Sequence, residues 1–296
     1  MKKIISTLFI VGLMACCAFA QAKKAPIFYA HQGECTIEPP NTAAAVKTAF
    51  ELGSKYVEID LFMTKSGELV CIHCNNQLKS MWETGGKKVE ELTKEDILKT
   101  RLKKGYKYAA KYPDMHISTL DDVFKVTPKN GYLIIDARGF RPGYAEKFDE
   151  AIARAGLERS KMILPIYAMD SFRKLSKEYN KGVIFIWLSK KPPEKNLTAE
   201  QVLAGQKKGK NFKFLKWLGI GQAGFGAKDY CARLNDKDYF RKFRAEGIAP
   251  CAWTTDDPEI AKVLIDEYDV EVIATNKPAE MRKALGYPKE LKKPRY

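Results

Sequence analysis

Apolar and β-branched runs alternate with helical patterns along most of the chain. Strand-like runs lie at residues 27–31, 56–62, 69–73, 132–136, 162–166, 183–187, 214–220, 249–253 and 270–275. Helical periodicity marks residues 41–53, 119–126, 144–155, 170–178, 236–246, 257–267 and 278–285. Alternation of β and α over this length predicts an α/β fold with a parallel sheet, and it favours a (β/α)8 TIM barrel.

A ninth strand exceeds the eight that such a barrel holds. Only residues 64–67 separate the second and third runs. A parallel crossover needs a dozen or more residues, so we expect this pair to form an antiparallel hairpin. A rival doubly wound sheet is disfavoured because no glycine-rich phosphate fingerprint follows the first strand.

A long polar segment at residues 75–118 interrupts the alternation after the hairpin. It contains Gly85-Gly86, several lysines and a short helical pattern at residues 93–100. Connections of this length are uncommon in a compact domain unless they have a function or structure of their own. We therefore predict that it is a small inserted subdomain, or lid, after the second barrel strand.

The N-terminus has the pattern of a targeting signal. Lys2 and Lys3 precede a largely apolar stretch at residues 4–20, which ends in Ala18-Phe19-Ala20 with small residues at the cleavage positions. This pattern predicts a signal peptide over residues 1–20, removed on export. The expected location is therefore secreted or periplasmic.

The remaining residues, 21–296, form one predicted domain. A membrane anchor is the weaker interpretation of the N-terminal stretch, which is marginally short for a span, so no stable membrane span is expected. A second alternative is a lipoprotein anchored through Cys16, because residues 13–16 loosely match a bacterial lipobox. Met14 fits that pattern poorly.

Composition narrows the class of protein. The chain of 296 residues is 45% hydrophobic and 29% charged, which excludes a disordered tail, a collagen-like fibre and a disulfide-dense mini-protein. Loss of Lys2 and Lys3 with the signal lowers the formal net charge from +15 to +13. The surplus lysines occur in separate short runs, so we expect solvated surface and no nucleic-acid partner.

Polar residues at strand ends give the functional hypothesis. His31 ends the first strand and His73 ends the return strand of the hairpin. Glu58 and Asp60 are two positions apart on the second strand, so both carboxylates point to one side. Asp136 ends the next strand. In a barrel the carboxyl ends of the strands meet at one rim, where we expect these five side chains to converge.

This set of residue types suits metal-assisted acid–base chemistry. Carboxylate oxygens without a cysteine ligand favour a hard cation, Mg²⁺ or Ca²⁺. Two nearby histidines are able to act as general acid and general base. Each residue has a structural alternative, a salt-bridged pair for the acids and a satisfied hydrogen bond for a histidine, but the combination favours function.

Several motifs, in order, resemble the glycerophosphodiester phosphodiesterase family. Its patterns H-R-G, E-N-T, E-L-D, T-K-D-G and H-D match short segments near the strand ends: Ala30-His31-Gln32-Gly33, Pro40-Asn41-Thr42, Val57-Glu58-Ile59-Asp60, Thr64-Lys65-Ser66-Gly67 and Ile72-His73. Further matches follow at Ser118-Thr119-Leu120, residues 133–138, Trp253-Thr254 and Ala274-Thr275-Asn276-Lys277-Pro278. The matches extend from residue 27 to about residue 280.

The resemblance implies a TIM-barrel phosphodiesterase that uses one divalent cation. It assigns catalysis to His31 and His73, and metal binding to Glu58, Asp60 and Asp136. The expected substrate is a small phosphodiester, a glycerophosphodiester or lipid head group, hydrolysed to glycerol 3-phosphate and an alcohol. The implied substrate-binding residues are Arg138 for phosphate, Gln32 beside it, and Trp253, which either walls the pocket for the alcohol or packs within the barrel.

Four positions depart from the family patterns. Gln32 replaces the arginine of H-R-G, Pro40 replaces the glutamate of E-N-T, and Cys74 replaces the aspartate of H-D. Glu38 lies close enough in sequence to compensate for Pro40. Asp136 stands where the family usually has glutamate, as in the distantly related sphingomyelinase D and phospholipase D toxins.

These departures leave alternatives open. One is another metal-dependent barrel hydrolase, for example a glycosidase, or a phospholipase D-type lyase with a different substrate. Another is a non-catalytic protein that binds phosphodiester head groups and retains the metal without turnover. The acidic triad and both histidines favour the phosphodiesterase.

Overall fold

The computed structural model describes residues 25–139, 141–166, 184–189, 215–221, 245 and 249–296. The predicted signal peptide, Cys16 and the predicted helix at residues 170–178 lie outside these ranges, as does all of the helix predicted at 236–246 except Ala245. Within the described ranges no helix has the length and apolar character needed to cross a membrane.

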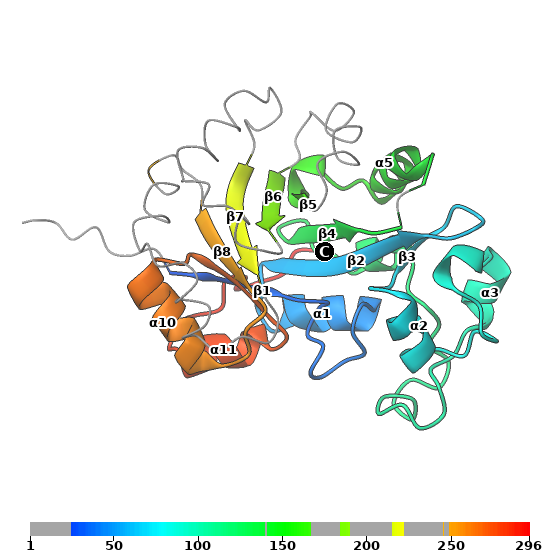
Figure 1. Ribbon diagram of the computed structural model, residues 1–296, viewed down its shortest axis with the longest axis horizontal. Helices are drawn as coiled ribbons and strands as arrows, with labels where there is room; N and C mark the ends of the chain where they lie inside the picture. Colours follow the sequence, from blue (N-terminus) through cyan, green and yellow to red (C-terminus); the bar gives the residue numbers. More distant parts are fainter. Residues whose placement is uncertain (1–24, 140, 167–183, 190–214, 222–244, 246–248) are drawn as a thin grey trace, which may run out of the picture.

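Eight parallel strands form a closed barrel, as predicted. They are β1 (Ile27–Ala30), β2 (Tyr56–Met63), β4 (Tyr132–Ala137), β5 (Met162–Ile166), β6 (Ile184–Ser189), β7 (Leu215–Gly221), β8 (Ala249–Trp253) and β9 (Val272–Thr275). Neighbouring strands pair in the order β1-β9-β8-β7-β6-β5-β4-β2, and an additional β1–β2 pairing closes the ring. Figure 1 shows the curled sheet around the centre of the molecule.

The ninth strand is the predicted hairpin partner. β3 (Leu69–Cys71) pairs antiparallel with the end of β2, with Leu61 opposite Cys71 and Met63 opposite Leu69. A tight turn joins the two strands, in which Thr64 accepts a hydrogen bond from the Gly67 backbone. β3 is shorter than expected, so His73 lies beyond the strand rather than at its end.

Helices cover the outside of the barrel. They are α1 (Ala43–Glu51), α4 (Leu120–Lys125), α5 (Tyr144–Ala155), α10 (Pro258–Tyr268) and α11 (Pro278–Ala284). Their starts follow from local sequence: Thr119 and Asp122 form a reciprocal capping box at α4, and Asp257 caps α10 just before a proline at its first position. The apolar faces pack against the strands, with Phe50, Val123 and Phe148 fully or nearly buried.

Residues 75–118 have their own elements and share an apolar core with Val70 of β3 and Ile72 just after it. α2 (Asn75–Met81), the 3₁₀ turn η1 (Val89–Glu91) and α3 (Lys94–Lys99) pack around a buried Trp82, Leu92 and Ile97. In Figure 1, α2 and α3 lie below the β2–β3 hairpin, on the side of the molecule opposite α10 and α11. The segment therefore extends the rim of the barrel next to β2.

Candidate active site

Three carboxylates meet at the carboxyl ends of β2 and β4. The parallel register places Asp60 directly beside Asp136 and places Glu58 two residues earlier on the same side of β2. One oxygen from each of the three side chains lies within 4.8 Å of the others, and all three residues are buried. The strand positions predicted from sequence thus bring the acidic triad together.

Among the residues that the structure describes, the triad carries more negative charge than its surroundings neutralise. Burial, and then repulsion from Asp60, raises the pKa of Glu58 and of Asp136 well above their usual range. The Arg138 guanidinium opposes this shift. Its Nε donates to Asp60 Oδ1 at 2.6 Å, and its Nη2 donates to Asp136 Oδ2. Asp136 Oδ1 is buried and has no hydrogen-bond partner in the structure.

A divalent cation fits this donor set. Three hard oxygen ligands converge here. In the described part of the chain one guanidinium pairs with two of the three carboxylates, and one buried carboxylate oxygen has no hydrogen-bond donor. Buried carboxylates without enough opposite charge are costly, so an added cation at this place would be strongly favoured. Glu58, Asp60 and Asp136 are the residues able to hold it.

The loop after β1 closes over the triad. The Gln32 backbone N–H donates to Glu58 Oε2 at 2.8 Å, and its side-chain Nε2 donates to Asp60 Oδ2 at 2.8 Å. Gly33 follows with a φ of +80°, where a Cβ atom would lie 2.6 Å from the backbone of Ala45. Glycine is therefore required for the loop to lie this close to α1.

Asn41 is a site residue that the sequence analysis quoted in a motif but did not assign to the site. It exchanges two hydrogen bonds with Asp60, donating to Oδ2 and accepting from the backbone N–H, each at 2.9 Å. Its φ of +56° is a conformation that asparagine tolerates better than most residues. This combination holds the central carboxylate from both its backbone and its side chain.

Gln77, on α2, was missed altogether. Its Oε1 accepts from the His73 backbone N–H at 2.7 Å, and its Nε2 donates to Gln32 Oε1 at 3.0 Å. Because Gln32 in turn donates to Asp60, a directed chain of amides joins the insertion to the triad. Both polar atoms of the Gln32 side chain thus form hydrogen bonds with protein groups. A contact between Gln32 and the substrate stays a prediction. No local pattern marks Gln77.

The two predicted catalytic histidines are half-buried and come from different parts of the rim. The His31 backbone N–H donates to Thr275 O at 2.9 Å, and its ring Nδ1 lies 2.8 Å from Asn276 Oδ1. His73 lies between β3 and α2, where Gln77 holds its backbone. The third histidine, His116, lies in the insertion with Nδ1 against the Ile117 carbonyl.

Trp253 and Glu38, two further residues singled out from the sequence, make contacts within the protein framework. Trp253 ends β8 and packs, partly buried, against the core cluster that includes Tyr29 and Cys251. Glu38 does not take the place of the missing motif glutamate, because Lys111 binds both its carboxylate oxygens at 2.8 and 2.9 Å. Glu38 instead ties the loop after β1 to the insertion.

The four cysteines that the structure describes are not part of the triad. Cys35, Cys71, Cys74 and Cys251 are all free thiols, which leaves no disulfide among these four. Cys71 and Cys251 are buried in the barrel, where desolvation raises the pKa of each thiol. Cys231 lies outside the described residues.

Comparison with known proteins places the chain in a family. The model of the glycerophosphoryl diester phosphodiesterase family matches residues 31–280. Among relatives, a glycerophosphodiester phosphodiesterase of Caldanaerobacter subterraneus is 31% identical over 162 residues, which are 53% of this chain and 65% of that protein. The matched region thus spans less than two thirds of that relative's length.

Solved structures share the fold. A glycerophosphodiester phosphodiesterase from Parabacteroides distasonis has a TM-score of 0.65 at 18% identity, covering 89% of this chain and 98% of that one. A phosphodiesterase from Oleispira antarctica, solved with sn-glycerol-3-phosphate, has a TM-score of 0.67 at 16% identity, covering 88% and 97%. Since the family model matches most of the sequence, the resemblance is confirmed: this chain belongs to the glycerophosphoryl diester phosphodiesterase family.

Proposed function

We propose that the protein is a metal-dependent phosphodiesterase that hydrolyses glycerophosphodiesters to glycerol 3-phosphate and an alcohol. The observation that carries this proposal is the buried triad, whose oxygens lie within 4.8 Å of one another with one of them unpartnered. Family membership supports the reaction class. The relative solved with sn-glycerol-3-phosphate supports the expected product.

Glu58, Asp60 and Asp136 are the proposed ligands of the cation. When bound, a divalent cation supplies Lewis-acid stabilisation of the charge that develops on a phosphate oxygen. Oxygen ligands suit Ca²⁺ and Mg²⁺ equally in kind, so either ion is admitted. The hydrogen bonds from Gln32 and Asn41 orient the Glu58 and Asp60 carboxylates for this role.

The remaining residues bind phosphate and move protons. The Arg138 side chain is 26% exposed beside the triad, so its guanidinium presents positive charge to a phosphate oxygen. Of His31 and His73, one removes the proton from the attacking hydroxyl, and the other protonates the leaving alcohol oxygen. By analogy with the family, the attacker is the neighbouring glycerol hydroxyl, and water then opens the cyclic phosphate.

The test is release of glycerol 3-phosphate from glycerophosphocholine, with and without EDTA, by the wild type and Glu58→Gln. Loss of one charged ligand is expected to abolish most metal binding and to lower turnover at least about 100-fold. Glu83→Gln, an exposed residue of the insertion, is the matched control and is expected to behave as wild type. Unchanged, EDTA-sensitive turnover by Glu58→Gln would contradict the proposal.

A second candidate is a phospholipase D-type lyase on the same barrel. Two observations favour it. Asp136 stands in the third ligand position, as in the phospholipase D toxins. Gln32 stands where the family has a cationic arginine, and its amide is hydrogen-bonded to Asp60 and Gln77. Lysophospholipid assays separate the two reactions, because a lyase stops at a cyclic phosphate that accumulates. Metal binding without turnover on any of these substrates would indicate a binding protein.

We also propose that the mature protein is exported. The support is the N-terminal sequence alone, with two lysines, an apolar stretch and small residues at positions 18 and 20. N-terminal sequencing of the native protein should begin at residue 21. A lipid-modified N-terminus at Cys16 would instead establish the lipoprotein alternative.

A further inference from the structure

We propose that Asp256 and Asn276 form a relay that keeps the proton of neutral His31 on Nδ1 and leaves Nε2 free to exchange a proton with the substrate. Asp256 and Asn276 are thereby positioning residues, since neither is required to touch the substrate. The catalytic consequence rests on the proposed function, whereas the position of the proton on the ring does not.

Asp256 lies in the loop after β8 and accepts three hydrogen bonds from the end of β9. Its Oδ1 accepts from the Asn276 backbone N–H and from the Thr275 hydroxyl, both at 2.7 Å. Its Oδ2 accepts from Asn276 Nδ2 at 2.6 Å. Both carboxylate oxygens of Asp256 are thus hydrogen-bond acceptors.

This contact fixes which way the Asn276 amide faces. A carboxylate only accepts hydrogen bonds, so the NH₂ group of Asn276 must face Asp256, and Oδ1 must face the opposite way. Cys35 agrees with this orientation: its Sγ donates to Asn276 Oδ1 at 3.3 Å. Burial raises the pKa of the Cys35 thiol to about 12, so the sulfur keeps the proton that it donates.

The Asn276 orientation in turn determines which ring nitrogen of His31 carries the proton. The His31 Nδ1 lies 2.8 Å from Asn276 Oδ1, and an amide oxygen only accepts hydrogen bonds. Nδ1 must therefore carry a proton, and in the neutral ring the lone pair stays on Nε2. The predicted direction is Asp256 to Asn276 to His31, each step determined by the one before.

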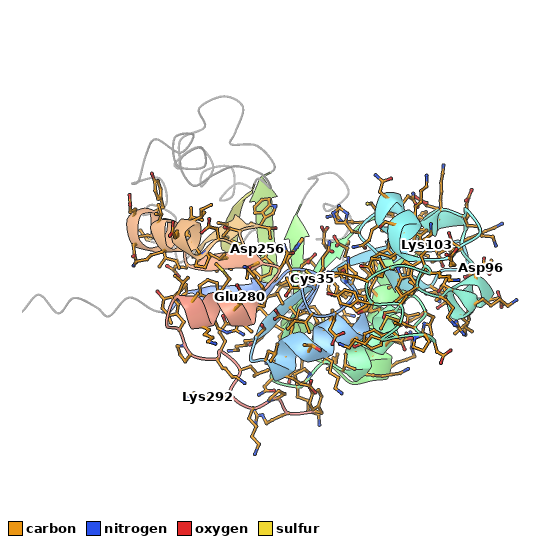
Figure 2. All side chains as sticks on the ribbon, turned by 90° about the horizontal axis from the view of Figure 1, so that it is seen from below. Cys35, Asp96, Lys103, Asp256, Glu280 and Lys292 are labelled. Atoms are coloured by element: carbon orange, nitrogen blue, oxygen red, sulfur yellow. The ribbon has the colours of Figure 1, made fainter. Side chains whose placement is uncertain are left out.

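The elements that hold the relay are rigid parts of the barrel. Thr275 ends β9 and pairs with Ala30 at the end of β1, and the next residue, His31, donates its backbone N–H to Thr275. The loop with Asp256 is tied to β9 by the Thr255 N–H, which donates to Ala274 at 3.0 Å. Figure 2 shows Asp256 and Cys35 close together in the middle of the molecule. Closely tied backbones of this kind suit a group that must be oriented precisely.

The experiment reads the ring proton directly, by ¹⁵N NMR of histidine-labelled protein at a pH where His31 is neutral. The chain has three histidines, so His73→Gln and His116→Gln assign the His31 signals. In the wild type we expect Nδ1 to show the shift of a protonated nitrogen and Nε2 that of an unprotonated one. In Asp256→Asn the Asn276 amide loses its anchor, and we expect part of the population to move to the Nε2–H form.

Turnover is measured alongside. For Asp256→Asn we expect kcat for glycerophosphocholine to fall roughly 100-fold with little change in KM, because a wrong tautomer removes the catalyst without removing binding. Asp257→Asn is the matched control, since Asp257 is the next residue and caps α10 without contacting Asn276. It loses the same charge, and we expect it to keep both the wild-type tautomer and kcat.

The outcomes are distinct. A wild-type His31 with its proton on Nε2, or an unchanged tautomer in Asp256→Asn, overturns the relay. A shifted tautomer with unchanged kcat overturns its catalytic role. If the wild type turns over no glycerophosphodiester, the proposed function fails, and the NMR result still decides whether the relay exists.

Discussion

Two groups of buried charges lie at opposite ends of the barrel strands, and they are built differently. At the amino ends, Glu290 accepts from the Phe28 backbone N–H at 2.6 Å and from the Lys55 N–H at 3.2 Å, with Arg282 3.8 Å away. Arg282 also donates to Ser54 and to the Leu52 carbonyl. Glu290 and Arg282 therefore face each other among backbone donors and acceptors, and the buried Glu34 adds a second carboxylate near Arg282.

At the carboxyl ends, the described residues do not balance the acidic charge. Three carboxylates lie around one guanidinium, and Asp136 Oδ1 has no hydrogen-bond donor among them. A charge pair that serves stability is matched and saturated, because an unpaired buried charge costs several kcal/mol. Three buried carboxylates gathered around one guanidinium at the rim form a place where a cation would be stabilised. An unpartnered carboxylate oxygen alone does not mark such a place, since Glu34 Oε2 is also buried without a hydrogen-bond partner among the described residues.

The largest expected effect is on activity, from Asp136→Asn. We expect turnover to fall at least about 100-fold, since a metal ligand loses its charge. In EDTA we expect the free energy of unfolding to fall by no more than about 1 kcal/mol, because the change removes a poorly compensated buried charge. Turnover assays and urea unfolding in EDTA measure the two quantities, with Glu83→Gln as the control. A large loss of stability would mean that the triad is structural.

The opposite pattern is expected at the amino ends, from Glu290→Gln. The change removes the larger of the two carboxylate partners of the buried Arg282 and leaves Glu34 as the other, and we expect a loss of about 2–3 kcal/mol in the free energy of unfolding. Glu280→Gln removes an exposed carboxylate that pairs with Lys277, and it should cost less than about 1 kcal/mol. Turnover measured well below the melting temperature should be unchanged in both variants. A loss of kcat in Glu290→Gln alone would show that the charge pair at the amino ends also affects catalysis.

A cation should stabilise the wild type through the triad alone. Ligand present at 100 times its Kd adds about 2.7 kcal/mol to the stability of a folded state that binds it. We therefore expect Ca²⁺ or Mg²⁺ to raise the melting temperature of the wild type and of Glu290→Gln, but not of Glu58→Gln. Equal shifts in all three proteins would place the ion elsewhere.

The smallest expected effect concerns pH. Burial, opposed by Arg282, raises the pKa of Glu34 from 4.5 to about 7. The folded protein then binds the Glu34 proton more tightly than the unfolded chain does. The contribution of Glu34 to stability is therefore greatest below pH 4.5 and is lost as the pH rises through about 7. Glu34→Gln should remove that loss, with a gain on the order of 1–3 kcal/mol at pH 8 relative to pH 4.

Thermal unfolding of wild type and Glu34→Gln across this pH range measures the difference. The other carboxylates with a raised pKa, Glu58, Asp136 and Glu290, are present in both proteins and cancel in the comparison. Parallel stability curves for the two proteins would show that Glu34 does not titrate in this window.

Much of the fold and part of the site could be predicted from local sequence. The alternation of strands and helices indicated the barrel, and the four residues between the second and third runs indicated a hairpin. The period of two along β2 placed Glu58 and Asp60 on one side, and strand direction brought Asp136 beside them. These inferences hold because they depend on backbone periodicity and connection length, which are properties of short segments.

The sequence by itself thus determined the architecture and the acidic triad, whereas the tertiary structure alone decided how those groups are held. His31 and Asn276 are 245 positions apart, and Gln32 and Gln77 are 45 apart. Which amide faces which carboxylate depends on the closure of the ring between β1 and β9 and on the docking of α2 at the rim. Short-range sequence patterns do not predict such contacts, because the direction of a hydrogen bond depends on the partner and not on the residue alone.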